Sequence, residues 1–247
     1  MTIHRVHLPL AYTAFFGVMG LVTASCLPAC RGSGPDSEEG QTVSTRMLPS
    51  GKIEVIAARA QGPPDGTITF LVDYVTELPT SDHVALARQA NEVFAEFIQE
   101  ARKANARTML VRATDTSRNS SAVFPFTAEK DGQWERPEVR TLQSGKEVVV
   151  VSVNEHDGKL FVDYVTDLPI RDYCGLASEV DQVWAEVREE ADEMGVDKIF
   201  VSPAETPLDG GSVSYAFLRE GNGDWLRQKA CPGDADYVHV SDAAAQP

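Results

Sequence analysis

Apolar and polar residues alternate along two short segments of the chain whose sequences are almost the same. Residues 71–79 read Leu-Val-Asp-Tyr-Val-Thr-Glu-Leu-Pro, and residues 161–169 read Phe-Val-Asp-Tyr-Val-Thr-Asp-Leu-Pro. Such alternation is typical of a strand that has one face against a core. Of the 44 residues from 72 to 115, 16 are identical to the residue 90 positions later, whereas unrelated sequences would match at about three. The chain therefore contains an internal repeat.

Each copy of this strand is followed by a segment with the periodicity of a helix. Apolar residues recur there at steps of three and four, which places them on one helix face: Leu86, Ala90, Val93, Phe97, Ala101 and Ala104, then Leu176, Val180, Val183, Val187, Ala191 and Met194. Asp82 and Asp172 stand where a side chain would cap the start of the helix. Asn105 and Gly195 stand where a left-handed residue would end it.

Strands are predicted on both sides of each helix. An earlier strand spans about residues 52–60 and 147–153, and Asp-Gly pairs at 65–66 and 157–158 indicate a hairpin turn after it. A strand at 108–113 or 198–202 follows the helix, and a last hairpin ends near Trp134 or Trp225. The predicted fold class is α+β: two tandem homologous β-β-α-β-β-β modules, at 51–140 and 141–231, each with one helix packed on a mainly antiparallel sheet.

The beginning of the chain has the pattern of an export signal. A short segment with one Arg and no acid precedes an apolar run at 8–22, which is followed by Thr-Ala-Ser-Cys. This resembles the lipobox of bacterial lipoproteins, in which a cysteine is lipidated and becomes the new N-terminus. Cys26 follows Val-Thr-Ala-Ser and Cys30 follows Leu-Pro-Ala, so either could be the modified residue. Cleavage before Cys30 leaves an even pair of cysteines, which favours it. The alternative is ordinary signal cleavage after Ala24, without a lipid.

The resemblance implies a membrane anchor for a folded part that lies farther along the chain. We assign residues 1–29 to the signal and residues 30–50, rich in Gly, Ser, Pro and acid, to a flexible tether. Residues 232–247 contain few core-forming side chains and are predicted to be a frayed C-terminal tail.

The charge of the chain restricts its partners. A formal net charge of -15 and a pI of about 4.7 argue against nucleic-acid binding, which needs a basic surface. The acidity is concentrated in the second module: residues 51–140 hold 11 basic and 13 acidic residues, and residues 141–231 hold 8 and 18. The acidic run of the second predicted helix is either a solvated face or a surface for a basic partner.

The sequence offers few parts for catalysis. It contains no Gly-rich phosphate loop, no Cys or His cluster for a metal and no Gly-x-Ser-x-Gly motif, so we predict no catalytic residue, metal or cofactor. After the signal, the histidines are His83, His156 and His239. None of them recurs in the other module, and isolated histidines in loops and first helical turns are commonly solvated.

The repeated polar residues Asp73, Tyr74, Asp163 and Tyr164 are the candidates for a binding site. A strand carboxylate with apolar neighbours can be partly buried, with a raised pKa suited to acid or base chemistry. The simpler interpretation is structural: the aspartates hydrogen-bond backbone groups or pair with a basic neighbour, and the tyrosine rings pack in the core.

Cys174 and Cys231 occur only in the second module. In an exported protein such a pair is expected to form a disulfide. The bridge would join the start of the second helix to the segment that follows the last strand.

Together these patterns predict an exported, lipid-anchored protein of the bacterial cell envelope. We expect it to act as a non-enzymatic binding or adaptor module, with an envelope protein as partner and an N-terminal acyl chain in the lipid bilayer. The alternative activity is an envelope hydrolase that uses strand carboxylates in a cleft between the modules. The alternative location is soluble, in the periplasm or outside the cell.

Overall fold

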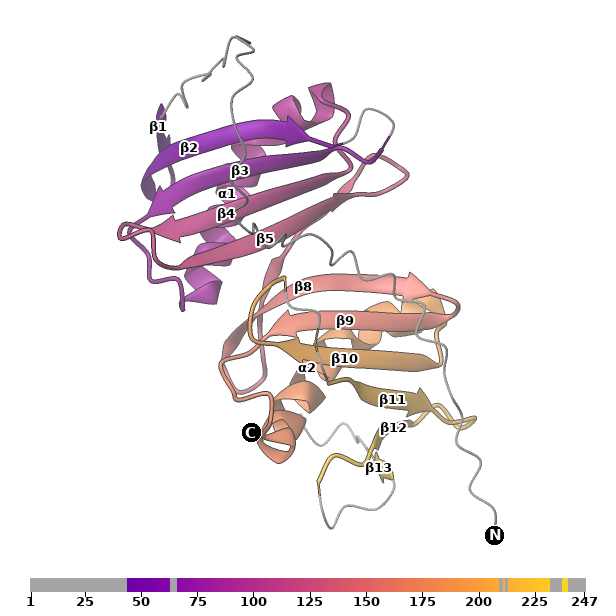
Figure 1. The fold of residues 1–247 in the computed structure, drawn as a ribbon. Coiled ribbons are helices and arrows are strands. Elements are labelled where there is room, and N and C mark those ends of the chain that lie inside the picture. The colour runs from indigo at the N-terminus through magenta and orange to yellow at the C-terminus, as the bar shows by residue number, and fades with distance from the viewer. Residues whose placement is uncertain (1–43, 63–65, 209–210, 212, 232–236, 240–247) are drawn as a thin grey trace, which may run out of the picture. The chain divides into compact units, whose positions relative to one another are not determined.

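A computed structural model of the chain describes residues 44–62, 66–208, 211 and 213–231, together with the backbone of 237–239. It confirms the α+β class and an organisation into two sheet-plus-helix modules (Figure 1). The predicted signal, both candidate lipidation cysteines Cys26 and Cys30, and most of the predicted tether lie outside the described residues.

The first module consists of a six-stranded sheet and one helix. The sheet order is β1-β2-β3-β4-β5-β6, with β3 and β4 parallel and the other neighbours antiparallel. The helix α1 connects the two parallel strands. The elements are β1 (Ser44–Leu48), β2 (Gly51–Gln61), β3 (Thr69–Thr76), α1 (His83–Lys103), β4 (Thr108–Asp115), β5 (Ser121–Ala128) and β6 (Trp134–Glu135).

The second module has the same order of elements with one more strand. Its sheet order is β13-β12-β11-β10-β9-β8-β7, with β9 and β10 parallel and joined through α2. The elements are β7 (Glu138–Thr141), β8 (Glu147–His156), β9 (Lys159–Val165), α2 (Tyr173–Met194), β10 (Lys198–Ala204), β11 (Tyr215–Arg219), β12 (Trp225–Gln228) and β13 (Tyr237–His239).

Both helices begin and end where the sequence predicts. The Asp82 carboxylate accepts a hydrogen bond from Ala85 N–H at 3.0 Å, and Asp172 accepts one from Gly175 N–H at 2.9 Å. These bonds satisfy backbone donors that the first helical turn leaves free. Beyond the helices, Asn105 has φ 55° and Gly195 has φ 68°, the left-handed conformation that stops a helix.

Each helix covers one face of its own sheet, and the core of each module lies between its helix and its sheet. In the first module the buried aromatic residues are centred on Phe94, which stacks on Phe126 with ring centroids 4.4 Å apart. In the second, Trp184 stacks on Phe217 at 5.4 Å. Burial of these side chains supplies the main favourable free energy of folding.

The edges of the modules differ from the sequence-based boundaries. Residues 44–48 form the edge strand β1 instead of continuing the tether, which the sequence analysis extended to residue 50. Only Leu48 of this strand is buried, so its apolar pattern is too weak to reveal a strand. Likewise, β7 begins at residue 138, before the expected boundary at 141, and β13 lies within the expected frayed tail.

The two modules contact one another. Three valines on the face of the second sheet opposite α2, Val149, Val151 and Val165, belong to the core cluster of the first module. Polar contacts add to this apolar one: Arg88 of α1 pairs with Glu147 at the start of β8. The Val153 N–H of β8 donates to a carboxylate oxygen of Glu135 at 3.0 Å.

Candidate functional site

The strand aspartate of the first module, Asp73, forms an ion pair. Asp73 lies directly opposite Arg112 on the neighbouring parallel strand. The Arg112 Nε atom is 3.4 Å from a carboxylate oxygen of Asp73, whose side chain is 14% exposed. Of the two structural interpretations given above, this is pairing with a basic neighbour.

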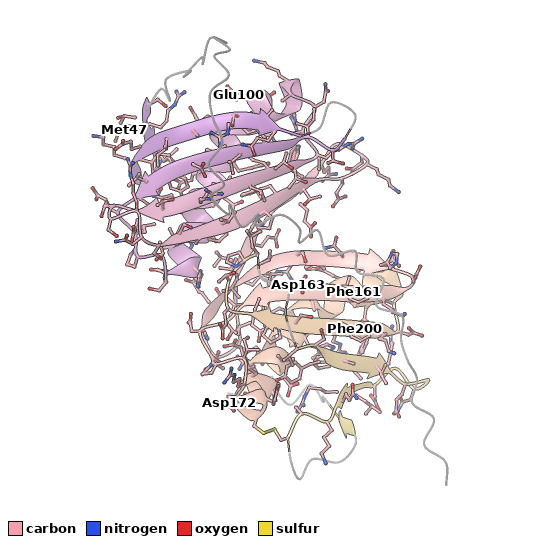
Figure 2. All side chains as sticks on the ribbon, in the orientation of Figure 1. Met47, Glu100, Phe161, Asp163, Asp172 and Phe200 are labelled. Atoms are coloured by element: carbon pink, nitrogen blue, oxygen red, sulfur yellow. A yellow bond between two sulfur atoms is a disulfide. The ribbon has the colours of Figure 1, made fainter. Side chains whose placement is uncertain are left out.

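The strand aspartate of the second module has a different surrounding. Asp163 lies opposite Ser202 instead of an arginine, and the Ser152 hydroxyl donates a hydrogen bond to it at 3.0 Å. Burial raises the pKa of Asp163, and the bond from Ser152 offsets this only in part. Figure 2 labels Asp163 on the second sheet with Phe161 and Phe200, whose rings stack at 5.1 Å.

Both candidate tyrosines point into the cores. Tyr74 and Tyr164 are 0% exposed, so they are not available for contact with a ligand on the surface. Burial is the main reason that the pKa of each hydroxyl is raised, with further contributions from Glu92 and Glu179 respectively. The four residues Asp73, Tyr74, Asp163 and Tyr164 therefore do not form one site.

The histidines do not join the strand aspartates. His83 lies in a cavity of about 390 Å³ together with Asp82 and Asp167. Burial lowers the pKa of His83, while Asp167 and Asp82 act in the opposite direction. His156 is exposed beside Asp157, at 3.4 Å. The side chain of His239 lies outside the described residues.

Cys174 and Cys231 are joined in a disulfide, with their Cα atoms 5.2 Å apart. The bridge links the first turn of α2 to the residue that follows the strand β12 by three positions. It lies in the second module alone and contributes no thiol to any site.

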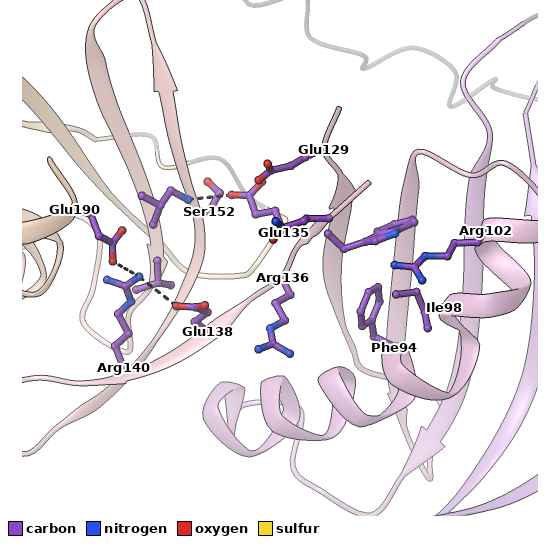
Figure 3. A pocket seen from close by; sticks show the side chains of 14 residues that line it. Phe94, Ile98, Arg102, Glu129, Glu135, Arg136, Glu138, Arg140, Ser152 and Glu190 are labelled. Atoms are coloured by element: carbon purple, nitrogen blue, oxygen red, sulfur yellow. Dashed lines mark hydrogen bonds and ion pairs between the residues drawn. The ribbon is translucent and has the colours of Figure 1, made fainter. Parts of the chain in front are cut away.

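A cavity of about 640 Å³ lies between the two modules and is the candidate functional site (Figure 3). Its walls come from α1, the turn before β6, the segment through β6 and β7, the strand β8 and one residue of α2. Helix α1 and β6 place apolar side chains on one side, and the segment from β6 to β7 places charged ones on the other.

The apolar side of the cavity is an aromatic and aliphatic surface. Phe94 and Ile98 come from successive turns of α1, and Trp134 begins β6. The Trp134 ring is tilted against Phe94 with centroids 5.6 Å apart. Trp134 and Ile98 are only partly buried, so this surface is open to the cavity.

Three arginines line the cavity, and they differ in their ion pairs. Arg140 is held by two carboxylates, Glu190 at 2.8 Å and Glu138 at 3.2 Å. Arg102 of α1 and Arg136, which directly follows β6, make no ion pair with another residue that the structure describes. Figure 3 shows the Arg102 side chain on the same side as Ile98, and Arg136 between Phe94 and Glu138.

Glu135 connects this cavity with a smaller one of about 220 Å³, which Asp163 also lines. Burial raises the pKa of Glu135, and the nearby carboxylates of Glu129 and Asp163 raise it further, whereas the hydrogen bond from Val153 N–H lowers it. A carboxyl between two cavities and beside like charges is thus partly protonated at a higher pH than an exposed glutamate.

Sequence reasoning did not select the residues of this cavity. Arg102 and Arg136 are ordinary charged residues in a pattern that predicts a solvated surface, and only the structure reveals that they lack a carboxylate partner among the described residues. One signal was present in the sequence. At the repeat offset of 90, Arg102 corresponds to Asp192, a reversal of charge.

Two further features of the described residues bear on chemistry. Within the described ranges, no cluster of three or more His, Cys, Asp or Glu side chains could hold a metal ion. Neither of the helices found there combines the length and the apolar composition that crossing a bilayer requires.

Comparisons with known proteins assign no family. No protein-family model matches the chain, and a search of the curated proteins finds no similar sequence. Among solved structures, the central domain of yeast acetyl-CoA carboxylase aligns over 80% of this chain and 49% of its own length, with 6% identity and a TM-score of 0.19. Similarity at that level carries no argument about fold or function.

Proposed function

We propose that the chain is an exported, lipid-anchored protein of the bacterial cell envelope that acts as a non-enzymatic binding or adaptor module. An acyl chain on Cys30 or Cys26 holds it at the membrane, and its partner is an envelope protein. The folded part is a tandem duplication of one β-β-α-β-β-β unit, in which the second copy has diverged in surface charge.

Paired local features support the duplication. Strand β2 has a bulge opposite the Asp-Tyr pair of β3: Val55 pairs with Tyr74, and Ala57 pairs with Asp73. Strand β8 has the same bulge between Val150 and Ser152, opposite the Asp-Tyr pair of β9. The register of a bulge is specific to a family of sheets. Its recurrence opposite the same Asp-Tyr pair therefore favours descent from one unit.

The aromatic clusters give independent support. The ring at the middle of the helix contacts a stacked Phe and a tilted Trp in both modules. The second set lies 90 or 91 positions after the first: Phe94, Phe126 and Trp134, then Trp184, Phe217 and Trp225.

The observation that carries the binding role is the cavity between the modules. It presents two arginines without an ion pair to any described residue beside an open aromatic surface. An unpaired arginine next to apolar surface is a common recognition element, because its planar donors bind carboxylates and its face stacks on rings.

Affinity capture tests this role. The tagged full-length chain, recovered from detergent-solubilised envelopes of the source organism, is expected to carry a stoichiometric protein partner. The double variant R102E/R136E should lose that partner, because reversed charges repel the group that the arginines bind. The variant K52E, at an exposed position of β2, is the control and should retain it. Capture of nothing by the unmodified chain would contradict the adaptor role.

A hydrolase with strand carboxylates is the second candidate, and one observation favours it. Asp163 and Glu135 line the same cavity of about 220 Å³, and burial raises the pKa of both carboxyls. A raised pKa lets a carboxyl keep its proton to a higher pH, which favours a role as a general acid. Asp73 does not line this cavity and pairs with Arg112 instead. The test measures the rate at which the chain hydrolyses an envelope polymer. The same rate in D163N as in the unmodified chain would exclude this candidate.

A further inference from the structure

The second module has no open aromatic surface at the place that corresponds to the cavity. Arg188 lies over the Trp184 ring at 5.7 Å, and Arg219 lies over the Trp225 ring at 5.8 Å. Asp192 stands between the two arginines, 3.8 Å from Arg188 and 3.2 Å from Arg219. The module thus covers its own aromatic rings with two cations held by a central carboxylate.

The first module lacks each part of this cover. By the repeat offset, Ile98 replaces Arg188 and Arg102 replaces Asp192. Ala128 replaces Arg219, since Ala128 pairs with Trp134 as Arg219 pairs with Trp225. Two arginines are therefore lost above the rings, and a cation stands where the carboxylate would be. The rings consequently face the cavity: Trp225 is 2% exposed, while Trp134 is only partly buried.

A second pair of corresponding residues shows the same difference. In the second module, Arg227 Nε lies 2.7 Å from a carboxylate oxygen of Asp181 on α2, and the Arg227 side chain is 7% exposed. The corresponding residues of the first module are Arg136 and Asn91. The Asn91 amide donates to the backbone oxygens of Ala87 and Pro137 and offers no negative charge. Arg136 is left in the cavity without the carboxylate that its counterpart has.

The internal carboxylates of the second module indicate what the first module lacks. Asp192 gives a singly charged carboxylate to the two arginines that lie over the aromatic rings, and Asp181 gives one to Arg227. A doubly charged phosphate fits less well than a singly charged carboxylate, because the four glutamates that also line the cavity, Glu129, Glu135, Glu138 and Glu190, repel a dianion more strongly. Arginine binds a carboxylate through two parallel N–H bonds, and the open rings favour an apolar group attached to it.

We propose that the cavity between the modules binds an organic carboxylate with an apolar or aromatic body. Arg136 and Arg102 hold the carboxylate, and the surface of Phe94, Ile98 and Trp134 receives the body. The inference rests on the proposed binding function and gives it a ligand class. The carboxylate belongs either to a free small molecule or to the C-terminus of a peptide, since both present the same group.

Titration of the full chain in detergent with 3-phenylpropionate, followed by calorimetry and by tryptophan fluorescence, tests the proposal. A ligand of this size should bind with a Kd on the order of 1 mM or tighter. Neutral 3-phenylpropionamide should bind at least about tenfold more weakly, the loss expected for one charged hydrogen-bonded pair. A peptide that ends in Phe, compared with its C-terminal amide, shows whether a protein C-terminus binds more tightly than the free acid.

Variants locate the site. R136Q and R102Q should each raise the Kd for 3-phenylpropionate about tenfold. K52Q should leave the Kd unchanged, because β2 is separated from β6 by three strands of the first sheet. W134F should remove the fluorescence change and retain the heat of binding. N91D restores the internal carboxylate beside Arg136 without removing any cavity side chain, and it should also weaken binding.

Equal affinity for the acid and the amide, or an unchanged Kd in both R136Q and R102Q, would overturn the proposal. Absence of binding by the unmodified chain would overturn it as well. Capture of an envelope partner does not depend on this probe. If the unmodified chain captures a partner but does not bind the acid, the ligand class alone is contradicted. If the unmodified chain captures nothing, the adaptor role is contradicted.

Discussion

Asp73 and Asp163 occupy the same position in their strands, but they have different electrostatic surroundings. Asp73 has the guanidinium of Arg112 beside it, whereas Asp163 has only the neutral hydroxyl of Ser152. A neutral donor stabilises a carboxylate less than a cation does, and burial opposes the charge. The pKa of Asp163 is raised for this reason.

The raised pKa of Asp163 predicts a specific pH dependence of stability. Because the folded state binds the proton more tightly than the unfolded state, the contribution of Asp163 to stability is greatest below its ordinary pKa of 3.8 and is lost as the pH rises through the raised value. When the pH is raised from 4 to 7.5, the free energy of unfolding of D163N should therefore fall less than that of the unmodified chain. Urea unfolding at the two pH values measures this. The exposed Asp197, changed to Asn, should behave as the unmodified chain; an unchanged pH profile in D163N would contradict the account.

Trp184 carries the aromatic cluster of the second core. It is 2% exposed and contacts both Phe217 and Trp225. W184A should lower the free energy of unfolding by about 3–5 kcal/mol, since it removes buried apolar area and leaves a cavity. W134A removes the ring that corresponds to Trp225 in the first module; because Trp134 is only partly buried, this variant should cost clearly less. Equal losses measured by urea unfolding would show that the two clusters are buried alike.

At the scale of elements, the disulfide fixes the start of α2 to the segment after β12. Its two cysteines are separated by 57 residues, and a loop of that length corresponds to about 4 kcal/mol of stabilisation in the chain-entropy model. C174S/C231S should lower the free energy of unfolding by up to that amount. Reduction of the unmodified chain should give the same midpoint in urea as the double variant. A double variant as stable as the oxidised chain would argue against the bridge.

The helices and inner strands could be predicted because their signals are strong. A single apolar face recurs in both copies over residues 83–103 and 173–194, and the caps Asp82 and Asp172 mark where each helix begins. The edge strands β1 and β7 could not be predicted. They are four or five residues long and bury little, so the alternation of their side chains is too short to read.

The residues that line the cavity could not be predicted from the sequence, for a different reason. The repeated residues Asp73, Tyr74, Asp163 and Tyr164 attract attention because both copies contain them, yet shared residues of two modules mostly serve the shared fold. The cavity is built from differences, such as Arg102 against Asp192 and Asn91 against Asp181. A difference in charge becomes informative only when the structure shows which partner each side chain has.

At the scale of the whole molecule, Glu135 connects the modules through one backbone hydrogen bond. It accepts from the Val153 N–H at 3.0 Å, and both residues are only partly exposed. E135A should lower the free energy of unfolding by about 1 kcal/mol, because the Val153 donor loses its acceptor. E135Q retains an acceptor and should lose less. Hydrogen exchange at the Val153 amide, faster in E135A than in E135Q, would identify the cause; equal exchange in the two variants would contradict it.

The central claim is that the chain binds its partner or ligand in the cavity between the modules. A photo-crosslinking amino acid at position 98, in place of Ile98 on the apolar side of the cavity, tests this most directly in the living envelope. Mass spectrometry of the purified chain after irradiation identifies what has been attached. We predict one dominant adduct at position 98, which is lost when R136Q is added and is absent with the crosslinker at position 52. No adduct, or the same adducts at positions 98 and 52, would contradict the claim.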